Sequence, residues 1–492
     1  MIFSSPQFIL LFLPIAFFGY FYLNRIRLIL AGKAWLVVTS LFFYAYWNVA
    51  YLPLLLISIF FNFAVGSALP PNSTSRRPRF SRRFILISSI TLNLALLGYF
   101  KYANFLIDNI NAAFNVGYVL PPILLPLGIS FFTFTQIAYL VDSYRGVAKE
   151  YDFLNYALFV TFFPHLIAGP ILHHREMMSQ FESRWILAVR YRNIVLGLFI
   201  FSMGLFKKAV IADTFAMWAN SGFDSGLTLY FFSAWATSLS YTFQLYFDFS
   251  GYCDMAIGAS LLFNIWLPIN FNSPYKALDI QDFWRRWHMT LSRYLRDYLY
   301  IPLGGNRCST AHTYFNLMAT FILGGLWHGA SWMFVIWGAL HGAALVAHRA
   351  WSGLGLRMPK AAAWLLTFNF VNITWVFFRA KTLDDARRII GGMMDINSVF
   401  DFPVIAIPTG NLAWGGWFSD YLLRWLPTGL AANMLCFGAI ILALGIISQK
   451  NSFELMMSGQ GMAKLSGALL LFCIAMYSVM ITTSSVFLYF NF

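Results

Sequence analysis

Charged residues are scarce in this chain, and that scarcity excludes most soluble folds. Asp, Glu, Lys and Arg make up 11% of the 492 residues, whereas hydrophobic residues make up 59%. A soluble globular domain carries roughly 25% charged residues, so this chain cannot keep its apolar surface out of water. Its apolar stretches have helix length and lack the alternation of barrel strands, which favours an α-helical bundle. The composition therefore predicts an all-α, polytopic membrane protein.

Cysteine and acidic residues are also few, and each shortage narrows the functions open to the chain. The four cysteines (Cys253, Cys308, Cys436 and Cys473) lie far apart, which excludes a disulfide framework and a zinc motif. Asp and Glu number 19 against 33 Lys and Arg, for a formal net charge of +14. The excess is concentrated in short loops, which indicates topology signals and contacts with anionic membrane lipid. We expect no metal and no tightly bound cofactor. We also expect no nucleic-acid partner, since the sequence has no signature of a nucleic-acid-binding fold.

Apolar stretches recur along the whole chain. A membrane-crossing helix needs about 20 such residues, so the chain has room for about 11 to 13 spans. Two further apolar stretches, residues 151–171 and 251–268, are interrupted by proline and glycine, and we expect them to be re-entrant around an internal cavity. No tandem repeat or long linker divides the chain, which predicts a single domain over residues 1–492. The candidate spans are residues 6–24, 34–49, 52–69, 84–102, 122–143, 193–212, 227–247, 312–327, 332–348, 362–378, 429–448 and 465–485.

Lysine and arginine in the loops predict the orientation. Three basic residues between Arg25 and Lys33 follow the first span, and five arginines between Arg76 and Arg83 follow the third. Positively charged loops stay on the cytoplasmic side, so both loops are expected inside. Counting spans onward then places both termini and residues 395–427 outside. One group departs from the rule because the same scheme leaves it outside: Arg379, Lys381, Arg387 and Arg388.

One histidine lies inside a run otherwise suited to lipid. The run extends from Gly324 to Ser331, and the histidine is His328. Ionisable groups at membrane depth are costly, so they usually face an internal cavity and carry function. Neutral imidazole is also well suited to accept a proton near neutral pH, which makes His328 a candidate general base. The alternative is a core histidine that is hydrogen-bonded to a carbonyl.

Residues 283–298 combine aromatic and basic side chains in a pattern that predicts one amphipathic helix, with Arg286, Arg293 and Asp297 on one side. Tryptophan at headgroup level with guanidinium in water suits an anchor at the membrane interface. A second interpretation is a cationic mouth for a phosphate-bearing molecule, because arginine binds phosphate in a bidentate manner. The glycines of residues 303–307 would let the backbone approach such a ligand. The candidate donor-binding residues are Arg285, Arg286, Arg293, Arg296, Asn306 and Arg307, beside His288.

Three other features have two interpretations each. Asp248 and Asp254 lie in an apolar region, where pairing with one of the nearby arginines is favoured over an ion or proton site. His165 lies in a proline-broken stretch, where it lines a cavity or closes a turn. Residues 487–492 form an aromatic tail that contains Tyr489, and such a tail is most often an anchor at the membrane interface.

Several of these segments resemble the membrane-bound O-acyltransferases, in the branch of the alginate O-acetyltransferase membrane subunits. The resemblance also extends toward the membrane subunits of peptidoglycan O-acetylation and teichoic-acid D-alanylation. It covers the chain from Met1 to the C-terminus and is weakest over about residues 350–465. The matching segments are Trp-Arg-Arg-Trp-His (284–288) with Leu-Gly-Gly-Asn-Arg (303–307), Gly-Gly-Leu-Trp-His-Gly-Ala (324–330), Phe-Pro-His-Leu-Ile-Ala-Gly-Pro (163–170) and Leu-Tyr-Phe-Asp-Phe-Ser-Gly-Tyr (245–252).

This resemblance implies a helical bundle around a central tunnel in which an acyl donor from the cytoplasm meets a catalytic histidine. It implies His328 as that histidine and His288 as a second functional one. The closing aromatic motif resembles that of proteins proposed to load an acyl group onto tyrosine, which makes Tyr489 a candidate acyl carrier. Asp248, His165 and Trp327 are expected to line or support the tunnel.

The same resemblance implies the donor and the partners. Acetyl-CoA or another acetyl thioester would dock its phosphates at the arginines. A soluble polymer outside cannot reach a cytoplasmic thioester, so acetyl has to be relayed across the bacterial inner membrane. The expected partners are a periplasmic esterase-like (SGNH) acetyltransferase subunit and a polysaccharide synthase complex, with an alginate-type exopolysaccharide as the first expectation for the polymer.

Two other classes of function stay open from the residues alone. A secondary transporter or channel would use Asp248, Asp254 and the buried histidines as an ion or proton relay. Such proteins often contain inverted repeats with paired broken helices, and the sequence has no internal symmetry. A catalytically silent scaffold would only recruit biosynthetic partners and would not need His328.

Overall fold

The computed structural model describes residues 1–70, 81–121, 123–148, 152–400, 428–459, 461–481 and 488, with side chains of 428–432 excluded. All regular secondary structure in these residues is helical, which confirms the predicted all-α fold. The sequence features that fall elsewhere lie outside the described residues: Arg76, Arg77 and Arg79, most of residues 395–427, and Tyr489 with most of the aromatic tail.

The chain forms two compact units, each of which draws on separate stretches of sequence. The first comprises Met1–Leu198 with Ala256–Pro268, and the second Phe199–Met255 with Ile269–Phe492. Two long helices, α9 (Tyr191–Phe206) and α11 (Phe231–Leu262), contribute residues to both units. A single domain over residues 1–492 stays a prediction.

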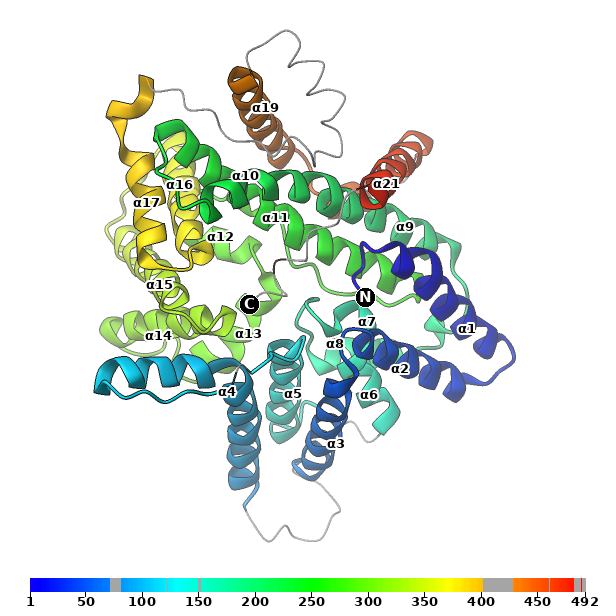
Figure 1. Ribbon diagram of the computed structural model, residues 1–492. Coiled ribbons are helices and arrows are strands. Elements are labelled where there is room, and N and C mark those ends of the chain that lie inside the picture. Colours follow the sequence, from blue (N-terminus) through cyan, green and yellow to red (C-terminus); the bar gives the residue numbers. More distant parts are fainter. Residues whose placement is uncertain are drawn as a thin grey trace. The chain divides into compact units, whose positions relative to one another are not determined.

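The first unit contains a helical hairpin, the long helix α4 and further helices of different lengths (Figure 1). Helices α1 and α2 form the hairpin and pack against each other. Prolines stand at the first turns of α1 and α3, where the absent amide proton is not needed. The elements are η1 (Phe8–Phe12), α1 (Leu13–Arg25), α2 (Ile29–Ala45), η2 (Val49–Tyr51), α3 (Leu52–Ala68), α4 (Arg82–Phe114), α5 (Ile129–Tyr144), α6 (Phe153–Thr161), α7 (Phe163–Leu166), α8 (His174–Phe181) and η3 (Arg184–Ile186).

A buried ladder of polar side chains joins α3, α4 and α5. Ser58 donates a hydrogen bond to Gln136 Oε1 at 3.0 Å, and Asn62 also donates to that oxygen. Asn62 and Asn93 exchange hydrogen bonds of 3.1 and 2.8 Å. Hydrogen bonds between helices stabilise packing where apolar surface alone provides little drive to associate. This ladder therefore helps to fix the register of the three helices.

The proline-interrupted stretch 151–171 is broken as predicted. The backbone turns away from helix at Phe162, and the next short helix begins at Phe163 with Pro164 in its first turn. The amide that the break releases at Phe163 is hydrogen-bonded to Ser40 Oγ of α2 at 3.0 Å. Residues 155–172 are all buried. The break is therefore satisfied from within the unit, which is the condition for irregular backbone in an apolar setting.

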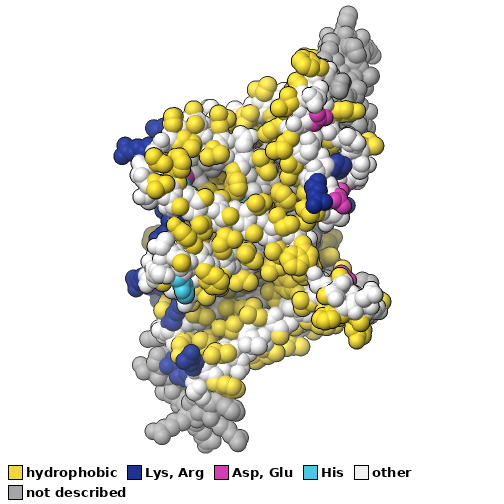
Figure 2. Space-filling model, turned by 90° about the vertical axis from the view of Figure 1, so that its left-hand side faces the viewer, with side chains coloured by type: hydrophobic (Ala, Val, Ile, Leu, Met, Phe, Trp, Pro, Cys, Tyr) yellow, Lys and Arg dark blue, Asp and Glu magenta, His cyan; other side chains and the backbone are white. Residues whose placement is uncertain are grey.

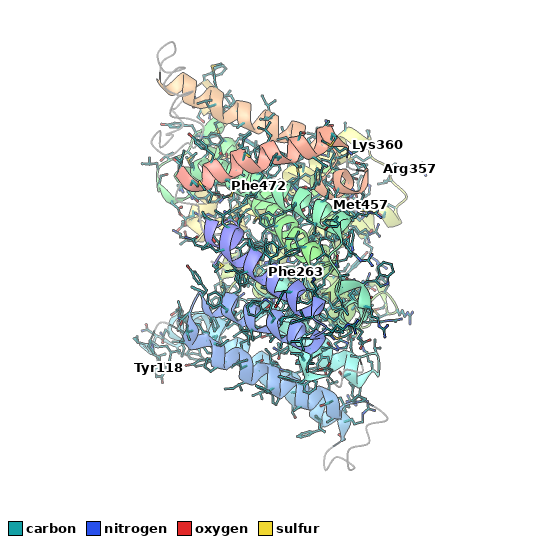
Figure 3. All side chains as sticks on the ribbon, turned by 90° about the vertical axis from the view of Figure 1, so that its right-hand side faces the viewer. Tyr118, Phe263, Arg357, Lys360, Met457 and Phe472 are labelled. Carbon is teal, nitrogen blue, oxygen red and sulfur yellow. The ribbon has the colours of Figure 1, made fainter. Side chains whose placement is uncertain are left out.

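An aromatic cluster holds the end of α11 in the first unit. Phe263, labelled in Figure 3, follows the last residue of α11 and is fully buried. Its ring centroid lies 5.7 Å from that of Tyr20 and 5.9 Å from that of Phe163, both in edge-to-face geometry. Such edge-to-face pairs contribute about 0.5–1.5 kcal/mol beyond the area they bury.

The second unit contains the segments with the candidate chemistry. Helices α14 and α15 pack closely along their length, because Gly325 and Gly338 leave room for the carbonyls of Phe334 and Phe321. The elements are η4 (Lys207–Ala212), α10 (Asp213–Asp224), η5 (Pro274–Lys276), α12 (Ile280–Arg286), α13 (Met289–Leu295), η6 (Arg296–Tyr300), α14 (Thr310–His328), α15 (Trp332–Gly353), α16 (Lys360–Arg379), α17 (Leu383–Met394), η7 (Ile396–Phe400), α19 (Thr428–Ser448), α20 (Ser452–Met457) and α21 (Met462–Ile481).

Several helices are suited to cross a membrane, and the protein is a multi-pass membrane protein. Two shorter apolar helices, Ile29–Ala45 and Asn433–Ser448, accompany them. Figure 2 shows a face on which hydrophobic side chains predominate and charged ones are sparse. In the described part of the chain, seven helices are long and apolar enough: Phe8–Arg25, Val49–Ala68, Arg82–Phe114, Tyr191–Asp224, Trp332–Gly353, Lys360–Arg379 and Met462–Ile481.

The prediction that residues 251–268 form a separate, broken stretch is wrong. Helix α11 continues without a break through Gly251 to Leu262. The glycines permit close contact between helices: a Cβ on Gly204 of α9 would lie 2.6 Å from the Gly251 carbonyl oxygen, and one on Gly197 would lie 2.8 Å from that of Gly258. α9 and α11 thus each place two glycines, seven residues apart, in their interface, and the two backbones are in direct contact there.

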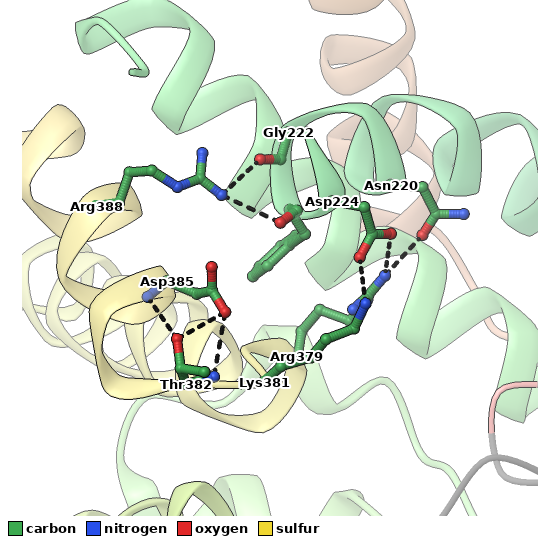
Figure 4. A network of polar contacts seen from close by, with 9 residues as sticks. Asn220, Gly222, Asp224, Arg379, Lys381, Thr382, Asp385 and Arg388 are labelled. Atoms are coloured by element: carbon green, nitrogen blue, oxygen red, sulfur yellow. Dashed lines mark hydrogen bonds and ion pairs between the residues drawn. The ribbon is translucent and has the colours of Figure 1, made fainter. Parts of the chain in front are cut away.

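The four basic residues that departed from the orientation rule are engaged in structural contacts, and Figure 4 shows those of Arg379, Lys381 and Arg388. Arg379 and Lys381 form ion pairs with Asp224 at 2.7 and 3.1 Å. Arg388 donates hydrogen bonds to the carbonyls of Gly222, Phe223 and Leu227 near the end of α10. A guanidinium at a helix C-terminus satisfies carbonyls that lack an intrahelical donor. Arg387 pairs with Asp384. The orientation itself stays a prediction.

Gly204→Ala tests the close contact between α9 and α11. The added methyl would meet the Gly251 carbonyl at 2.6 Å, so the helices must separate, at a cost of about 1–3 kcal/mol. We expect a lower thermal unfolding midpoint for the purified protein. Gly98→Ala is the matched control, because nothing lies within 4 Å of a Cβ on that helical glycine. Equal midpoints for the two variants would contradict the close contact.

Candidate active site

His328 is the last residue of α14 and is almost completely buried. Gly329 after it is extended, and Ser331 begins α15 by accepting a hydrogen bond from the Met333 amide. The side chain of His328 is 3% exposed. A Cβ on Gly329 would overlap the ring of Phe334, so any other residue directly after the histidine would displace that ring.

Aromatic rings from three helices surround His328. Its ring centroid lies 4.9 Å from that of Trp327 on α14, 5.2 Å from that of Trp337 on α15 and 5.2 Å from that of Phe378 on α16. The Trp337 ring stands almost perpendicular to the imidazole, at 89°. Sequence spacing identified His328 and Trp327, but it did not identify Trp337 or Phe378, which reach the site only through helix packing.

The structure brings His288 to the same place. Its ring centroid lies 6.4 Å from that of His328, 6.2 Å from that of Trp327 and 4.8 Å from that of Phe249 on α11. His288 is fully buried. Burial lowers the pKa of His288 to about 3, because the charged imidazolium loses its hydration. His288 is therefore a neutral imidazole at neutral pH, with one protonated nitrogen and one basic nitrogen.

The prediction of one continuous helix over residues 283–298 is wrong. Helix α12 ends at Arg286, Trp287 is extended, and His288 has a left-handed backbone with a φ of 43° before α13 begins. The neighbouring segment 270–272 causes the break: the Asn272 amide bonds to the Arg286 carbonyl at 2.9 Å, and the Met289 amide to the Asn270 carbonyl at 3.0 Å. The break turns Trp287 and His288 inward.

A third histidine in this region has a structural role. Trp284 Nε1 donates a hydrogen bond to His341 Nδ1 at 3.2 Å. An indole nitrogen can only donate, so the proton of His341 is on Nε2, which faces Thr374 Oγ1 at 3.0 Å. The Thr374 hydroxyl in turn donates to the Val371 carbonyl. Both ring nitrogens of His341 are thus engaged in holding α12, α15 and α16 together.

The predicted donor-binding arginines fall into two groups. Arg286 is paired with Asp282 at 2.9 Å, and Arg296 is paired with Asp297 at 2.7 Å. Each of these guanidinium groups is already neutralised by a carboxylate on its own segment. Arg285 and Arg307 have exposed side chains, whereas Arg293 is half-buried. The exposed pair are better suited to meet an anionic ligand.

Asn306 has a neighbour that the sequence did not indicate. The side-chain oxygen of this exposed residue accepts a hydrogen bond from Arg349 at 2.9 Å and another from the Tyr300 hydroxyl. Arg349 lies near the end of α15 and is exposed. It adds a further basic group beside the glycine-rich segment 303–307.

The two buried aspartates, Asp248 and Asp254, form ion pairs, as predicted. Their partners are lysines, however, and not the predicted arginines. Asp248 pairs with Lys208 at 2.8 Å, and Asp254 with Lys207 at 2.7 Å. Lys208 also pairs with Asp213 at 2.8 Å. Both lysines begin the π-helical turn η4, whose Ala209 carbonyl accepts a hydrogen bond from Ser478 of α21. π-Helical turns are rare and often occur at functional sites.

Asp248 also contacts the last described residue. The Leu488 amide donates a hydrogen bond to Asp248 Oδ2 at 2.9 Å, while the other carboxylate oxygen meets Lys208. Tyr489 lies outside the described residues.

His165 belongs to the first unit, whereas His328 and His288 belong to the second. It is 4% exposed and lies in the short helix α7, where Gly169 packs directly against its backbone. This surrounding fits the interpretation in which His165 closes a turn. Among the described residues, no three His, Cys, Asp or Glu side chains converge so that they could hold a metal ion.

Comparison with known proteins gives a consistent result. Residues 7–383 match the model of the membrane-bound O-acyltransferase family. The chain is 49% identical to a peptidoglycan O-acetyltransferase of Helicobacter pylori, over all of this chain and 98% of that protein. It is 41% identical to the probable alginate O-acetylase AlgI of Pseudomonas aeruginosa, over 90% of this chain and 81% of that protein. A teichoic acid D-alanyltransferase of Bacillus subtilis is 28% identical over 52% of this chain and 69% of that protein.

Proposed function

The chain belongs to the membrane-bound O-acyltransferase family, and we propose that it relays acetyl from a cytoplasmic thioester, acetyl-CoA, to a cell-surface polysaccharide. It is a multi-pass membrane O-acetyltransferase that acts on a cell-surface polymer. The observation that carries the proposed mechanism is the meeting of His328 and His288 within one aromatic enclosure. The relatives are bacterial, and we place the protein in the bacterial cytoplasmic membrane.

Peptidoglycan is the polymer that the comparisons favour. The relative named for peptidoglycan matches the whole chain at 49% identity, whereas those named for alginate match 80–90% of it at 40–43%. This ordering replaces the first expectation of an alginate-type exopolysaccharide, which becomes the second candidate. The membrane step is the same for both, because the protein passes on acetyl and the polymer is met outside.

His328 is proposed as the general base for transfer to a hydroxyl. The hydroxyl oxygen attacks the thioester carbonyl and its proton passes to the imidazole. The carbon–sulfur bond then breaks, and the departing thiolate takes the proton from the imidazolium. The products are an acetyl ester and the free thiol of CoA, and the base is restored. Rings of Trp327, Trp337 and Phe378 exclude water, which limits hydrolysis of the thioester.

The donor is proposed to bind through Arg285 and Arg307. Both guanidinium groups are exposed, and Arg349, bonded to Asn306, adds a basic group beside Arg307. Arginine binds phosphate through paired hydrogen bonds, which suits the phosphates of CoA. Arg286 and Arg296 are paired with aspartates and would contribute less.

Tyr489 is proposed as the carrier that receives acetyl and presents it on the outer side. A periplasmic esterase-like acetyltransferase, associated with a polysaccharide synthase complex, would then collect it. The hydrogen bond from the Leu488 amide to Asp248 supports this proposal, because it ties the adjacent residue to a buried ion pair of the second unit.

The alternative of an ion or proton relay through Asp248 and Asp254 has less support. Each carboxylate has a lysine partner within 2.8 Å, as expected for structural neutralisation. Ion flux into liposomes without any acetyl donor would favour the transporter.

His328→Ala tests the proposed general base. Without an imidazole, acetyl transfer from a labelled thioester should fall by roughly 10²–10⁴-fold, the usual contribution of a positioned base. Leu323→Ala, on an exposed face of the same helix, is the control and should retain transfer. Monodisperse elution of both variants would establish folding. Parental activity in His328→Ala would remove this histidine from the chemistry.

Tyr489→Phe tests the proposed carrier. The change keeps the ring and deletes only the hydroxyl, so acetylation of the cell-surface polymer should be lost while the protein still inserts in the membrane. Mass spectrometry should find an acetylated C-terminal peptide in the parent and not in the variant. Tyr477→Phe on the exposed surface of α21 is the control. If polymer acetylation in Tyr489→Phe equals that of the parent, Tyr489 is not the carrier.

Arg285→Gln and Arg307→Gln test the donor site. Each change removes an exposed charge, so the KM for acetyl-CoA should rise severalfold, with a smaller change in kcat, and the effect should weaken at high salt. Arg387→Gln removes an exposed arginine that pairs with Asp384 on α17 and should leave KM unchanged. An unchanged KM in the first two variants would reject this site.

A further inference from the structure

The backbone of residues 270–272 joins the two sides of the break that contains His288, through Asn272 to Arg286 and through Asn270 to Met289. Residues 270–272 bond to the Arg286 carbonyl on one side and to the Met289 amide on the other. The Asn270 side chain is 1% exposed. Its amide lies against the imidazole of His288.

The side-chain amide of Asn270 has a defined orientation. Its Oδ1 accepts a hydrogen bond from the backbone amide of Thr290 at 3.2 Å and another from the Thr290 hydroxyl at 3.0 Å. Its Nδ2 donates to the sulfur of Cys253 on α11 at 3.5 Å. A backbone amide can only donate, so the atom that faces it must be the amide oxygen and not the nitrogen.

This orientation determines where His288 carries its proton. His288 Nδ1 lies 3.2 Å from the same Asn270 Oδ1. An amide oxygen can only accept, so Nδ1 must donate and must hold the single proton of the neutral ring. The basic lone pair is then on Nε2. His341 has the opposite tautomer, since Trp284 occupies its Nδ1.

We propose that Asn270 is a positioning residue that fixes the tautomer of His288, so that this histidine offers the acetyl-transfer site a basic Nε2. In this state Nε2 accepts a hydrogen bond or a proton from a hydroxyl, and it does not donate to a developing oxyanion. The proposal rests on the proposed function in one respect only, namely that His288 acts in the transfer. The tautomer itself follows from the contacts.

An amide and a carboxylate at position 270 would both orient the His288 ring, but they would have different effects on its pKa. Asn270 orients the ring without adding negative charge, so the imidazolium gains no counter-charge and burial keeps the pKa of His288 near 3. A carboxylate at the same position would still accept from Nδ1 and from Thr290, and it would stabilise the imidazolium. Asn270→Asp should therefore keep the tautomer and raise the pKa of His288.

Nitrogen NMR of the full-length protein tests the tautomer without reference to activity. With ¹⁵N-labelled histidine, and His288→Gln to assign the signals, the parent should show a protonated Nδ1 and an unprotonated Nε2. Asn270→Asp should show the same tautomer with a titration at higher pH. Asn270→Leu should lose the preference for Nδ1. A parent spectrum with the proton on Nε2 would overturn the proposal, whether or not acetyl transfer is observed.

The pH profile of acetyl transfer tests the consequence. In Asn270→Asp the acidic limb should move to higher pH, because a raised pKa means that Nε2 is protonated over more of the range. Asn270→Leu should lower kcat by about tenfold or more with the donor KM unchanged, as expected when a catalytic imidazole loses its tautomer. Cys253→Ala removes the contact on the other side of the amide and should leave the profile in place.

The outcomes separate the two proposals. Superimposed profiles for Asn270→Asp and the parent, together with an unchanged kcat in Asn270→Leu, would reject a positioning role. Asn270→Asp decides the question if Asn270→Leu does not fold, because it keeps both hydrogen bonds to Thr290. The expected spectrum in a protein that fails to transfer acetyl would reject the proposed function and leave the tautomer assignment intact.

Discussion

Ionisable side chains inside this protein are surrounded by apolar ones, so each has to find its counterpart within the chain. An unpaired charge in such a setting costs several kcal/mol. Lys207 and Lys208 meet Asp254 and Asp248, and the second oxygen of Asp248 takes the Leu488 amide. His288 meets the same requirement as a neutral ring, because burial lowers its pKa to about 3. The rest of the second unit is arranged around these pairings.

Aromatic side chains pack around the buried polar groups. The chain contains 53 phenylalanines and 17 tryptophans. Large rigid rings fill space with little loss of side-chain entropy, and their edges can meet an imidazole face. Trp337 contacts both His328 and His341, at centroid distances of 5.2 and 4.8 Å. One indole thus links the proposed base to the histidine whose two nitrogens hold three helices together.

Local sequence was sufficient wherever local chemistry determines the backbone. Proline has no amide proton, so the break at Pro164 could be predicted from the residue alone. The break at Trp287–His288 could not, because residues 270–272 impose it from elsewhere in the chain. Gly251 was misread for the same reason: its role depends on Gly204 of another helix. The amphipathic pattern of residues 283–298 was real, yet it extended across a break.

The candidate site was predictable in part. Motif spacing identified both His328 and His288, and the structure places their rings 6.4 Å apart. Spacing could not reveal Asn270, Trp337 or Phe378, since each reaches His288 or His328 only through the tertiary packing of the chain. Nor could it tell a paired arginine from an exposed one: Arg285 and Arg286 both follow Asp282 by about one helical turn, and the ion pair with Asp282 is the one that Arg286 forms. Pairing in a fold is decided by geometry.

The left-handed backbone of His288 has a consequence for the evolution and engineering of this site. A φ of 43° costs an ordinary residue about 1–3 kcal/mol, whereas glycine adopts it freely. Selection for robustness alone would thus favour glycine here and would discard the imidazole. Stability favours glycine at this position, whereas the proposed reaction needs the imidazole. Consensus or stability-guided redesign of the protein should therefore keep His288 unchanged.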